Sequence, residues 1–297
     1  MQVLVTGGTG FVGRHVIREL IRAGHRVSLL VRPGSEKKLP PDLEVNLLWG
    51  DVLDPPSLIA AVKHCEAVVH LVGLIREFPK KGITFDQLHR QATFNMIAAV
   101  KYVGPDRFLH MSVLGARQDS ASAYYQTKAL AEIAVKVSGL DWTIFRPSVI
   151  FGPEDVSINL FASQVKKYPV MPVIGSGQYR LQPVSVKTVA QAFARSLDNP
   201  AAVGQCFDLT GPQAYTFDQL LEAIGRVLGR RVRLVHLPVW LFRLAAKMFG
   251  SWPSFPLSQS QLEMLLEGSV ADGSPAYQTL NLSPIPLEEG LRSYLKG

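Results

Sequence analysis

Residues 1–13 read Met-Gln-Val-Leu-Val-Thr-Gly-Gly-Thr-Gly-Phe-Val-Gly, an apolar stretch that leads into Gly7, Gly10 and Gly13. In this spacing the first glycine lets the chain reverse, the second lets the backbone approach a pyrophosphate, and the third lets a helix pack on the strand. The helix that follows begins with free N–H groups that attract an anion. A glycine turn without a ligand is the alternative. The helical spacing of the next apolar residues favours a phosphate-binding turn: Phe11, Val12, Val16, Leu20 and Ile21.

Composition and charge restrict the class of protein. The chain has 297 residues, 47% of them hydrophobic, and can bury a full core. Cys65 and Cys206 are too few for a disulfide framework and lack metal-ligand spacing, so we expect no metal site. The net charge of +7 favours anionic partners, but no nucleic-acid motif accompanies it, and we expect no nucleic-acid partner. Because Met1 directly precedes the first strand and no apolar run reaches membrane-spanning length, we expect a cytoplasmic protein.

The alternation of strands and helices predicts the fold, which is typical of an α/β protein with a Rossmann-type, doubly wound parallel sheet. We expect a dinucleotide-binding domain over 1–152 and a smaller C-terminal, substrate-side portion over 153–297. Within that portion, 182–210 is expected to return to the main sheet, and 216–228 to form a helix with Thr216 as its cap. The expected strands, with helices between them, are 3–6, 26–31, 45–49, 67–72, 107–111 and 142–145.

The end of the second strand indicates which dinucleotide binds. An NAD site usually has Asp or Glu there to accept hydrogen bonds from the ribose 2′-hydroxyl, whereas this chain has Arg32. A guanidinium pairs well with a 2′-phosphate, and Arg14 can reach the same region, so NADP(H) is favoured. A solvated strand-end arginine is the alternative. Asp51 can accept from the adenine amino group or cap the next helix, for which Asp54 is the better candidate. Other side chains that can assist at a 2′-phosphate are Ser35, Lys37 and Lys38.

The stretch Tyr124-Tyr-Gln-Thr-Lys128 indicates the chemistry. Tyr124 and Lys128 are four apart on a predicted helix over 123–137, for which Ser122 is a plausible cap, and so share one face. A neighbouring ammonium that favours the phenolate lowers the pKa of a phenol, which then serves as an acid or base at neutral pH. Lys128 can also bind the nicotinamide ribose. A surface patch of Tyr and Lys is the alternative, but the position after the fifth strand favours a catalytic pair.

The motifs Gly7-x-x-Gly10-x-x-Gly13, Tyr124-x-x-x-Lys128 and the run 146–153 together resemble the extended short-chain dehydrogenase/reductase superfamily over essentially the whole chain. The stretches 110–116, 147–155, 159–162 and 182–186 resemble its atypical branch, which contains the reductase-like accessory subunit of respiratory complex I and its bacterial relatives. The resemblance implies a bound NADP(H), with 147–149 beside the nicotinamide and 70–73 lining the cofactor. The residues expected at the cofactor are Gly7, Thr9, Gly10, Phe11, Val12, Gly13, Arg14, Arg32, Asp51, Val52, Leu71, Val72, Gly73, Lys128, Pro147, Ser148 and Val149.

Departures from the family pattern leave the activity open. A catalytic member has Ser or Thr at the end of the fifth strand to hold the substrate oxygen, and Ser112 is the candidate here. If the following Val113 or Leu114 occupies that place instead, no side chain can donate a hydrogen bond. The family's fourth polar residue lies on the preceding helix, where both His89 and Asn95 are candidates and the sequence does not distinguish them. Lys187-Thr188 replaces an acidic pair that is common in sugar-nucleotide epimerases, and lowers the expectation of that chemistry.

The segment 234–249 interleaves aromatic and aliphatic residues with Arg243 and Lys247. Such a segment lies on a membrane surface or contacts a quinone, or it packs as a helix on the core; the flanking Pro238 and Pro253 favour a bounded, buried helix. Three functions remain open: an NADPH-dependent reductase of a carbonyl or quinone-like molecule that uses Tyr124, Lys128 and Ser112; an NADP(H)-holding accessory or assembly factor of a membrane redox or quinone-making complex, peripheral to the membrane; and, lowest, a nucleotide-sugar epimerase or dehydratase.

Overall fold

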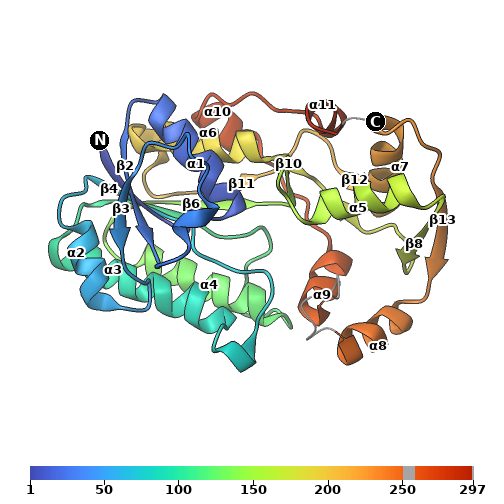
Figure 1. Cartoon of the computed structure of the whole chain (residues 1–297), viewed down its shortest axis with the longest axis horizontal. Coiled ribbons are helices and arrows are strands. Elements are labelled where there is room, and N and C mark those ends of the chain that lie inside the picture. Colours follow the sequence, from blue (N-terminus) through green and yellow to red (C-terminus); the bar gives the residue numbers. More distant parts are fainter. Residues whose placement is uncertain (250–257, 296–297) are drawn as a thin grey trace. The chain divides into compact units, whose positions relative to one another are not determined.

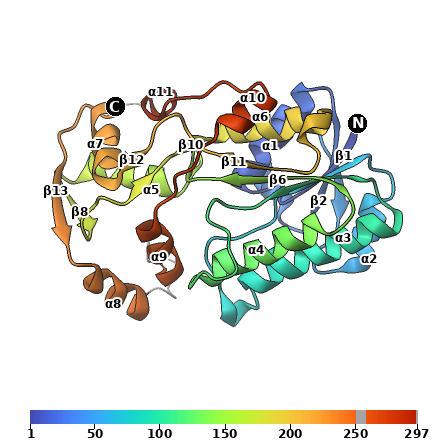
Figure 2. The same ribbon diagram turned by 180° about the vertical axis from the view of Figure 1, so that it is seen from behind.

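A computed structural model describes residues 1–249 and 258–295, and these residues form two compact units (Figures 1 and 2). The first unit consists of 1–147, 186–209 and 274–283. Its centre is a seven-stranded parallel sheet in the order β11-β6-β5-β4-β1-β2-β3. The strands are β1 (Gln2–Thr6), β2 (Arg26–Val31), β3 (Asn46–Trp49), β4 (Ala67–His70), β5 (Arg107–Met111), β6 (Asp141–Pro147) and β11 (Gln205–Leu209).

Helices cover both faces of this sheet, as Figures 1 and 2 show. Helices α1 (Phe11–Arg22) and α6 (Val186–Leu197) lie on one face, with α10 (Ser274–Thr279) beside them. The other face carries α2 (Pro55–Val62), α3 (Ala92–Val103) and α4 (Ala123–Lys136). The unit also contains a π-helix, Asp86–Gln91, and three short 3-10 helices: Glu36–Lys38, Pro79–Lys81 and Pro200–Ala202.

The order of the strands confirms the predicted Rossmann-type, doubly wound sheet. The chain runs from β1 outward through β2 to β3, then returns to the other side of β1 as β4. At such a reversal the loops after β1 and β4 diverge to opposite faces, and ligands bind in the crevice at the carboxyl ends of the strands. The core beneath is apolar and closed to solvent, since Val3, Leu4 and Val5 of β1 are fully buried.

The second unit consists of 148–185, 210–273 and 284–297. Within its described residues are three two-stranded sheets, which pair β7 (Ile150–Phe151) with β10 (Val184–Ser185), β9 (Arg180–Leu181) with β12 (Tyr215–Thr216), and β8 (Val170–Ile174) with β13 (Arg233–Leu237). Thr216 caps α7 in a reciprocal capping box with Gln219, as expected of a helix start at this residue. The helices are α5 (Ser157–Lys167), α7 (Phe217–Val227), α8 (Val239–Phe249), α9 (Gln259–Glu267) and α11 (Leu287–Arg292).

The segment 234–249 differs from the predicted buried helix. Its first residues form β13, and only the part after Pro238 is helical, as α8. Most large apolar side chains of α8 are exposed, Trp240 at 63% and Met248 at 60%, whereas the small Ala246 is buried. The prediction of a helix packed on the core is therefore wrong, because regular spacing creates an apolar face but does not supply a surface to cover it. Pro253 lies outside the described residues.

Candidate functional site

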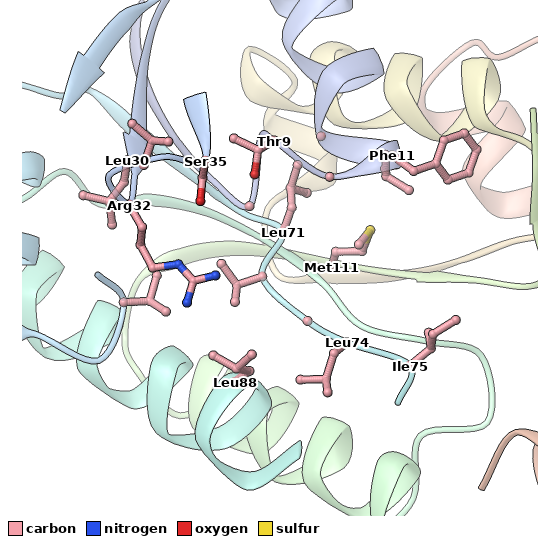
Figure 3. A pocket seen from close by; sticks show the side chains of 18 of the residues that line it. Thr9, Phe11, Leu30, Arg32, Ser35, Leu71, Leu74, Ile75, Leu88 and Met111 are labelled. Atoms are coloured by element: carbon pink, nitrogen blue, oxygen red, sulfur yellow. The ribbon is translucent and has the colours of Figure 1, made fainter. Parts of the chain in front are cut away.

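A cavity of about 580 Å³ lies at the carboxyl ends of β1, β2 and β4, and all its lining residues belong to the first unit (Figure 3). This is the edge of the sheet where a doubly wound fold binds its ligands. Fifteen of the residues expected from the sequence line it together: Gly7, Thr9, Gly10, Phe11, Val12, Gly13, Arg32, Asp51, Val52, Leu71, Val72, Gly73, Ser112, Tyr124 and Lys128.

The glycine turn forms one wall of the cavity and leaves no room for side chains. A Cβ at Gly13 would lie 2.4 Å from the Gly7 carbonyl oxygen and 2.5 Å from the Gly8 Cα. Gly7 has φ +76°, which disfavours any residue with a side chain, and its carbonyl accepts from the Gly10 N–H at 3.1 Å. Gly10 is also the residue that precedes α1, so the first N–H groups of that helix open onto the cavity. These residues fit a pyrophosphate.

The end of the cavity beside β2 and β3 is exposed and charged. The Arg32 side chain is 63% exposed and turns into the cavity, as Figure 3 shows. Its Nη1 lies 3.9 Å from Asp51 Oδ2, and Ser35 lines the same end. Asp51 does not cap α2: its Oδ1 accepts from the Leu53 N–H, while Asp54 accepts from the Ser57 N–H at the start of that helix.

The opposite end of the cavity is buried and holds Tyr124, Lys128 and Ser112, which are 6%, 2% and 4% exposed. Lys128 Nζ donates to the Met111 carbonyl at 2.9 Å, and burial lowers the pKa of Lys128 from 10.5 to about 8. Burial also raises the pKa of Tyr124 above its ordinary value of 10, with a smaller contribution from Tyr125. The expectation that Lys128 lowers the phenol pKa is therefore wrong, because desolvation of the phenolate dominates. At neutral pH Tyr124 is a neutral phenol and a proton donor.

Ser112 lies at the buried end of the cavity. Its Oγ is buried and makes no hydrogen bond to any described residue, although its backbone N–H donates to the Phe145 carbonyl at 2.7 Å. Ser112 lines the cavity, whereas Val113 and Leu114 do not. A buried hydroxyl without a partner costs free energy, which a ligand oxygen in the cavity relieves.

His89 lies behind the wall of the buried end. It belongs to the π-helix, a local widening that is frequent at functional sites, and its ring meets that of Tyr124 edge-on with centroids 5.3 Å apart. Its Nδ1 lies 2.9 Å from Thr127 Oγ1 and its Nε2 3.2 Å from the Leu74 N–H. Nε2 also lies 3.0 Å from the Leu74 carbonyl oxygen, so Thr127 and the Leu74 backbone together fix the orientation of the ring. Asn95 instead donates to the Val52 carbonyl. His89 is thus the polar residue that contacts the Tyr124 helix.

Several residues that the sequence predicts at the cofactor are not among those that line this cavity. Arg14 is outside the lining of the cavity, and its Nη1 donates to the Lys38 carbonyl at 3.4 Å. His70 lies below the cavity, where its Nδ1 is 2.7 Å from Thr6 Oγ1. Pro147 ends β6 and its carbonyl accepts from the Leu114 N–H. Ser148 and Val149 belong to the second unit, where the Ser148 hydroxyl donates to the Ser269 carbonyl.

Sequence patterns did not indicate part of the lining. Leu74, Ile75 and Leu88 lie along the side of the cavity opposite Thr9 and Phe11 (Figure 3), and Met111 directly precedes Ser112 in the chain. They are ordinary apolar residues without a motif; only their place directly after β4, or on a helix facing it, could have indicated them. The remaining lining residues are Leu30, Val31, Gly50, Arg76 and Phe78.

Comparison with known proteins agrees with this geometry. Residues 7–200 match the NAD(P)H-binding family. This matched region contains the glycine turn and the residues at both ends of the cavity. The chain belongs to this family. Its relatives and structural neighbours show that the resemblance to the extended short-chain dehydrogenase/reductases, with the complex I accessory subunit among its relatives, is correct. The family match indicates a nicotinamide cofactor, and the cavity lined by residues of the matched region is the candidate site for it.

Three relatives illustrate the range of the family. The chain is 32% identical to NADH dehydrogenase (ubiquinone) 1 alpha subcomplex subunit 9, mitochondrial, of Arabidopsis thaliana, over 99% of this chain and 78% of that protein. It is 30% identical to the ceramide reductase of Caulobacter vibrioides, over 85% of this chain and 78% of that protein. It is 24% identical to the photosystem II assembly factor Ycf39 of a Synechocystis strain, over 99% and 90% of the two chains.

A solved structure supports the fold. The UDP-glucose 4-epimerase of Thermotoga maritima superposes with a TM-score of 0.77 over 99% of this chain and 98% of its own, at 20% identity. Among the described residues, no helix combines the length and the apolarity that a membrane crossing requires.

Proposed function

We propose that this protein is an NADPH-dependent reductase of a carbonyl group in a largely apolar small molecule. The observation that carries the proposal is the burial of Tyr124 and Lys128 in the same cavity as the glycine turn. A bound nicotinamide cofactor supplies the hydride that reaches the carbonyl carbon. The ceramide reductase among the relatives supports a reductive direction and an apolar substrate.

The side chains at the buried end divide the remaining work. The Ser112 hydroxyl, which lacks a partner among the described residues, donates to the carbonyl oxygen and orients it. Tyr124 then donates its phenolic proton to that oxygen, so that the carbonyl becomes an alcohol and the tyrosine a phenolate. The raised pKa of Tyr124 suits a proton donor rather than a base. Lys128, four residues further along α4, shares the helix face of Tyr124 and lines the same cavity, and the phenolate regains its proton from solvent.

The exposed end selects the cofactor in this proposal. Arg32 stands where an NAD site usually has a carboxylate, and its guanidinium pairs with a 2′-phosphate. Ser35 on the same wall can donate a further hydrogen bond. These residues favour NADPH over NADH.

A second candidate function is to hold NADP(H) as part of a redox complex, without turnover. The complex I subunit and the photosystem II assembly factor among the relatives favour it, as does one contact at the site. Lys128 Nζ already donates to the Met111 carbonyl, and Tyr124 is almost closed off from solvent. An ammonium engaged in this way contributes less to a phenolate.

Oxidation of NADPH in the presence of a panel of long-chain ketones and quinones distinguishes the two candidates. The reductase proposal predicts turnover with at least one apolar carbonyl, and a loss of about 10²- to 10⁴-fold in Tyr124→Phe with unchanged NADPH affinity. Tyr125→Phe is the matched control, because Ala129 rather than a cation follows it by four residues. Tight NADPH binding without reduction of any carbonyl would favour the cofactor-holding function, as would turnover that Tyr124→Phe leaves intact.

A further inference from the structure

Helix α8 of the second unit carries an apolar stripe that faces solvent. Trp240 (63% exposed), Leu244 (50%) and Met248 (60%) recur every four residues along the helix. Leu241 (38%) lies beside them. The opposite face of the helix holds the buried Ala246, on the side that packs against the rest of the unit. Residues at this spacing form one continuous ridge on a helix. We refer to these four residues as the α8 stripe.

The α8 stripe is exposed in spite of having a neighbouring helix. Helix α9 lies beside α8 in both views of the molecule (Figures 1 and 2), and Arg243 Nε donates to Glu263 Oε1 across the pair at 3.1 Å. This ion pair joins the polar side of α8 to α9, while the residues of the stripe remain exposed to solvent. Single exposed apolar residues are ordinary on a protein surface, but a contiguous set that includes Trp marks a site of interaction.

The charge of α8 and of the segment before it favours an anionic partner. Helix α8 has no Asp or Glu and carries Lys247 and Arg243, of which Arg243 pairs with Glu263 of α9. The preceding residues 223–238 also have no Asp or Glu and add Arg226, which pairs with Glu288, and Arg230, Arg231 and Arg233. Lys247, exposed on α8, lies one turn from Arg243 and flanks the stripe. A short helix with Trp and Leu on one face, basic residues along its flank and no acidic residue suits the interface of an anionic bilayer, where the apolar face enters the acyl boundary and the basic groups meet lipid phosphates.

We propose that the α8 stripe attaches this protein to the surface of a membrane that contains anionic lipids. The helix lies in the plane of the interface, with Trp240, Leu244 and Met248 inserted below the headgroups and Lys247 at their level. The attachment is peripheral and reversible, because one helix of eleven residues buries little apolar area. If the proposed reductase function holds, this attachment keeps the protein at a source of apolar substrates.

Co-sedimentation of the full chain with vesicles tests the proposal. Vesicles of phosphatidylcholine alone are compared with vesicles of phosphatidylcholine and phosphatidylglycerol, and we expect binding to the anionic vesicles that weakens with added salt. Trp240→Ser with Leu244→Ser should lower the partition coefficient at least about tenfold. Lys247→Glu should lower it about fivefold or more on the anionic vesicles.

Substitutions of the same types on α3 of the first unit are the controls. Tyr102 is 74% exposed and Lys101 is exposed beside it, so Tyr102→Ser and Lys101→Glu should leave the partition coefficient unchanged. NADPH affinity and the thermal unfolding midpoint show that each variant is folded, since no residue of α8 lines the cavity.

Three results would overturn the proposal. The first is wild-type protein that stays in the supernatant with both kinds of vesicle. The second is a variant of the stripe that sediments as well as the wild type. The third is a concentration-dependent dimer in vesicle-free buffer that Trp240→Ser dissociates, which would assign the stripe to an interface between two copies of this chain.

Discussion

The two ends of the cavity differ in almost every physical respect. At the end beside β2 and β3, Arg32 and Asp51 have side chains that are 63% and 37% exposed, and water and salt screen their charges. At the other end Tyr124, Lys128 and Ser112 are nearly closed off from solvent, and burial moves two pKa values away from their ordinary ranges. A ligand that spans the cavity would meet solvent-screened charges at one end and desolvated polar groups at the other. We infer that the exposed end chooses between cofactors and the buried end carries the chemistry.

The pH dependence of stability tests the buried end with the largest expected effect. Lys128 has a pKa of about 8 in the folded protein against 10.5 in the unfolded chain, so between these values the unfolded chain binds more protons. The cost of burying the ammonium is present in full below pH 8 and is relieved as the pH rises through this window. The free energy of unfolding of the wild type, relative to Lys128→Met, should rise by on the order of 3 kcal/mol between neutral pH and pH about 10.

Urea unfolding of both proteins across this range measures that difference. The exposed Lys101 supplies the control, since the difference between the wild type and Lys101→Met should not change with pH. A flat difference for Lys128→Met as well would mean that the buried end is wetter than its burial implies, and the contrast between the two ends would weaken.

A substitution in the glycine turn, which lines the cavity between its two ends, should give the second-largest effect. A Cβ at Gly13 would meet the Gly7 carbonyl oxygen at 2.4 Å, so Gly13→Ala must displace α1 from β1. Overpacking of this kind costs about 1–3 kcal/mol and should weaken NADPH binding by about 10- to 100-fold. Fluorescence titration measures the affinity, and thermal unfolding separates displaced backbone from global unfolding. Arg22→Ala, at the exposed end of the same helix, is the control; a Gly13→Ala protein that binds NADPH normally would remove the turn from the site.

The exposed end should give the smallest effect. Asp51 Oδ2 lies 3.9 Å from Arg32 Nη1, and its charge opposes a 2′-phosphate there. Asp51→Asn should raise the affinity for NADPH by at most about fivefold at low salt, and the gain should fade as salt is added. Asp42→Asn, which alters an exposed pair with Arg18, should change nothing. A weaker NADPH affinity in Asp51→Asn would mean that the carboxylate itself holds the cofactor.

The sequence predicted the existence of the strands more accurately than the residues at which they end. The expected strands 26–31 and 107–111 coincide with β2 and β5, because buried parallel strands are short apolar runs bounded by polar residues. The expected strand 67–72 is too long, since β4 ends at His70. Leu71 and Val72 are apolar because they line the cavity, and apolarity alone does not distinguish a pocket wall from a strand.

In the site, too, local motifs were predicted correctly, whereas properties that depend on burial were not. Glycine spacing and the Tyr124–Lys128 pair are local signals, and the structure brings both to one cavity. The pKa of Tyr124 was predicted in the wrong direction, because the sequence shows the nearby lysine but not the depth of burial. The exposure of the α8 stripe was likewise hidden, since helical spacing reveals an apolar face without showing what covers it.

The most direct measurement is the titration of the wild type and Arg32→Ala with NADPH and NADH at one low ionic strength. The wild type should bind NADPH more tightly than NADH. Arg32→Ala should weaken NADPH binding about tenfold while NADH binding changes little, since a hydrogen-bonded ion pair to a 2′-phosphate contributes about 1–2 kcal/mol at an exposed site. A wild type that binds NADH more tightly, with a ratio that Arg32→Ala does not change, would contradict this prediction.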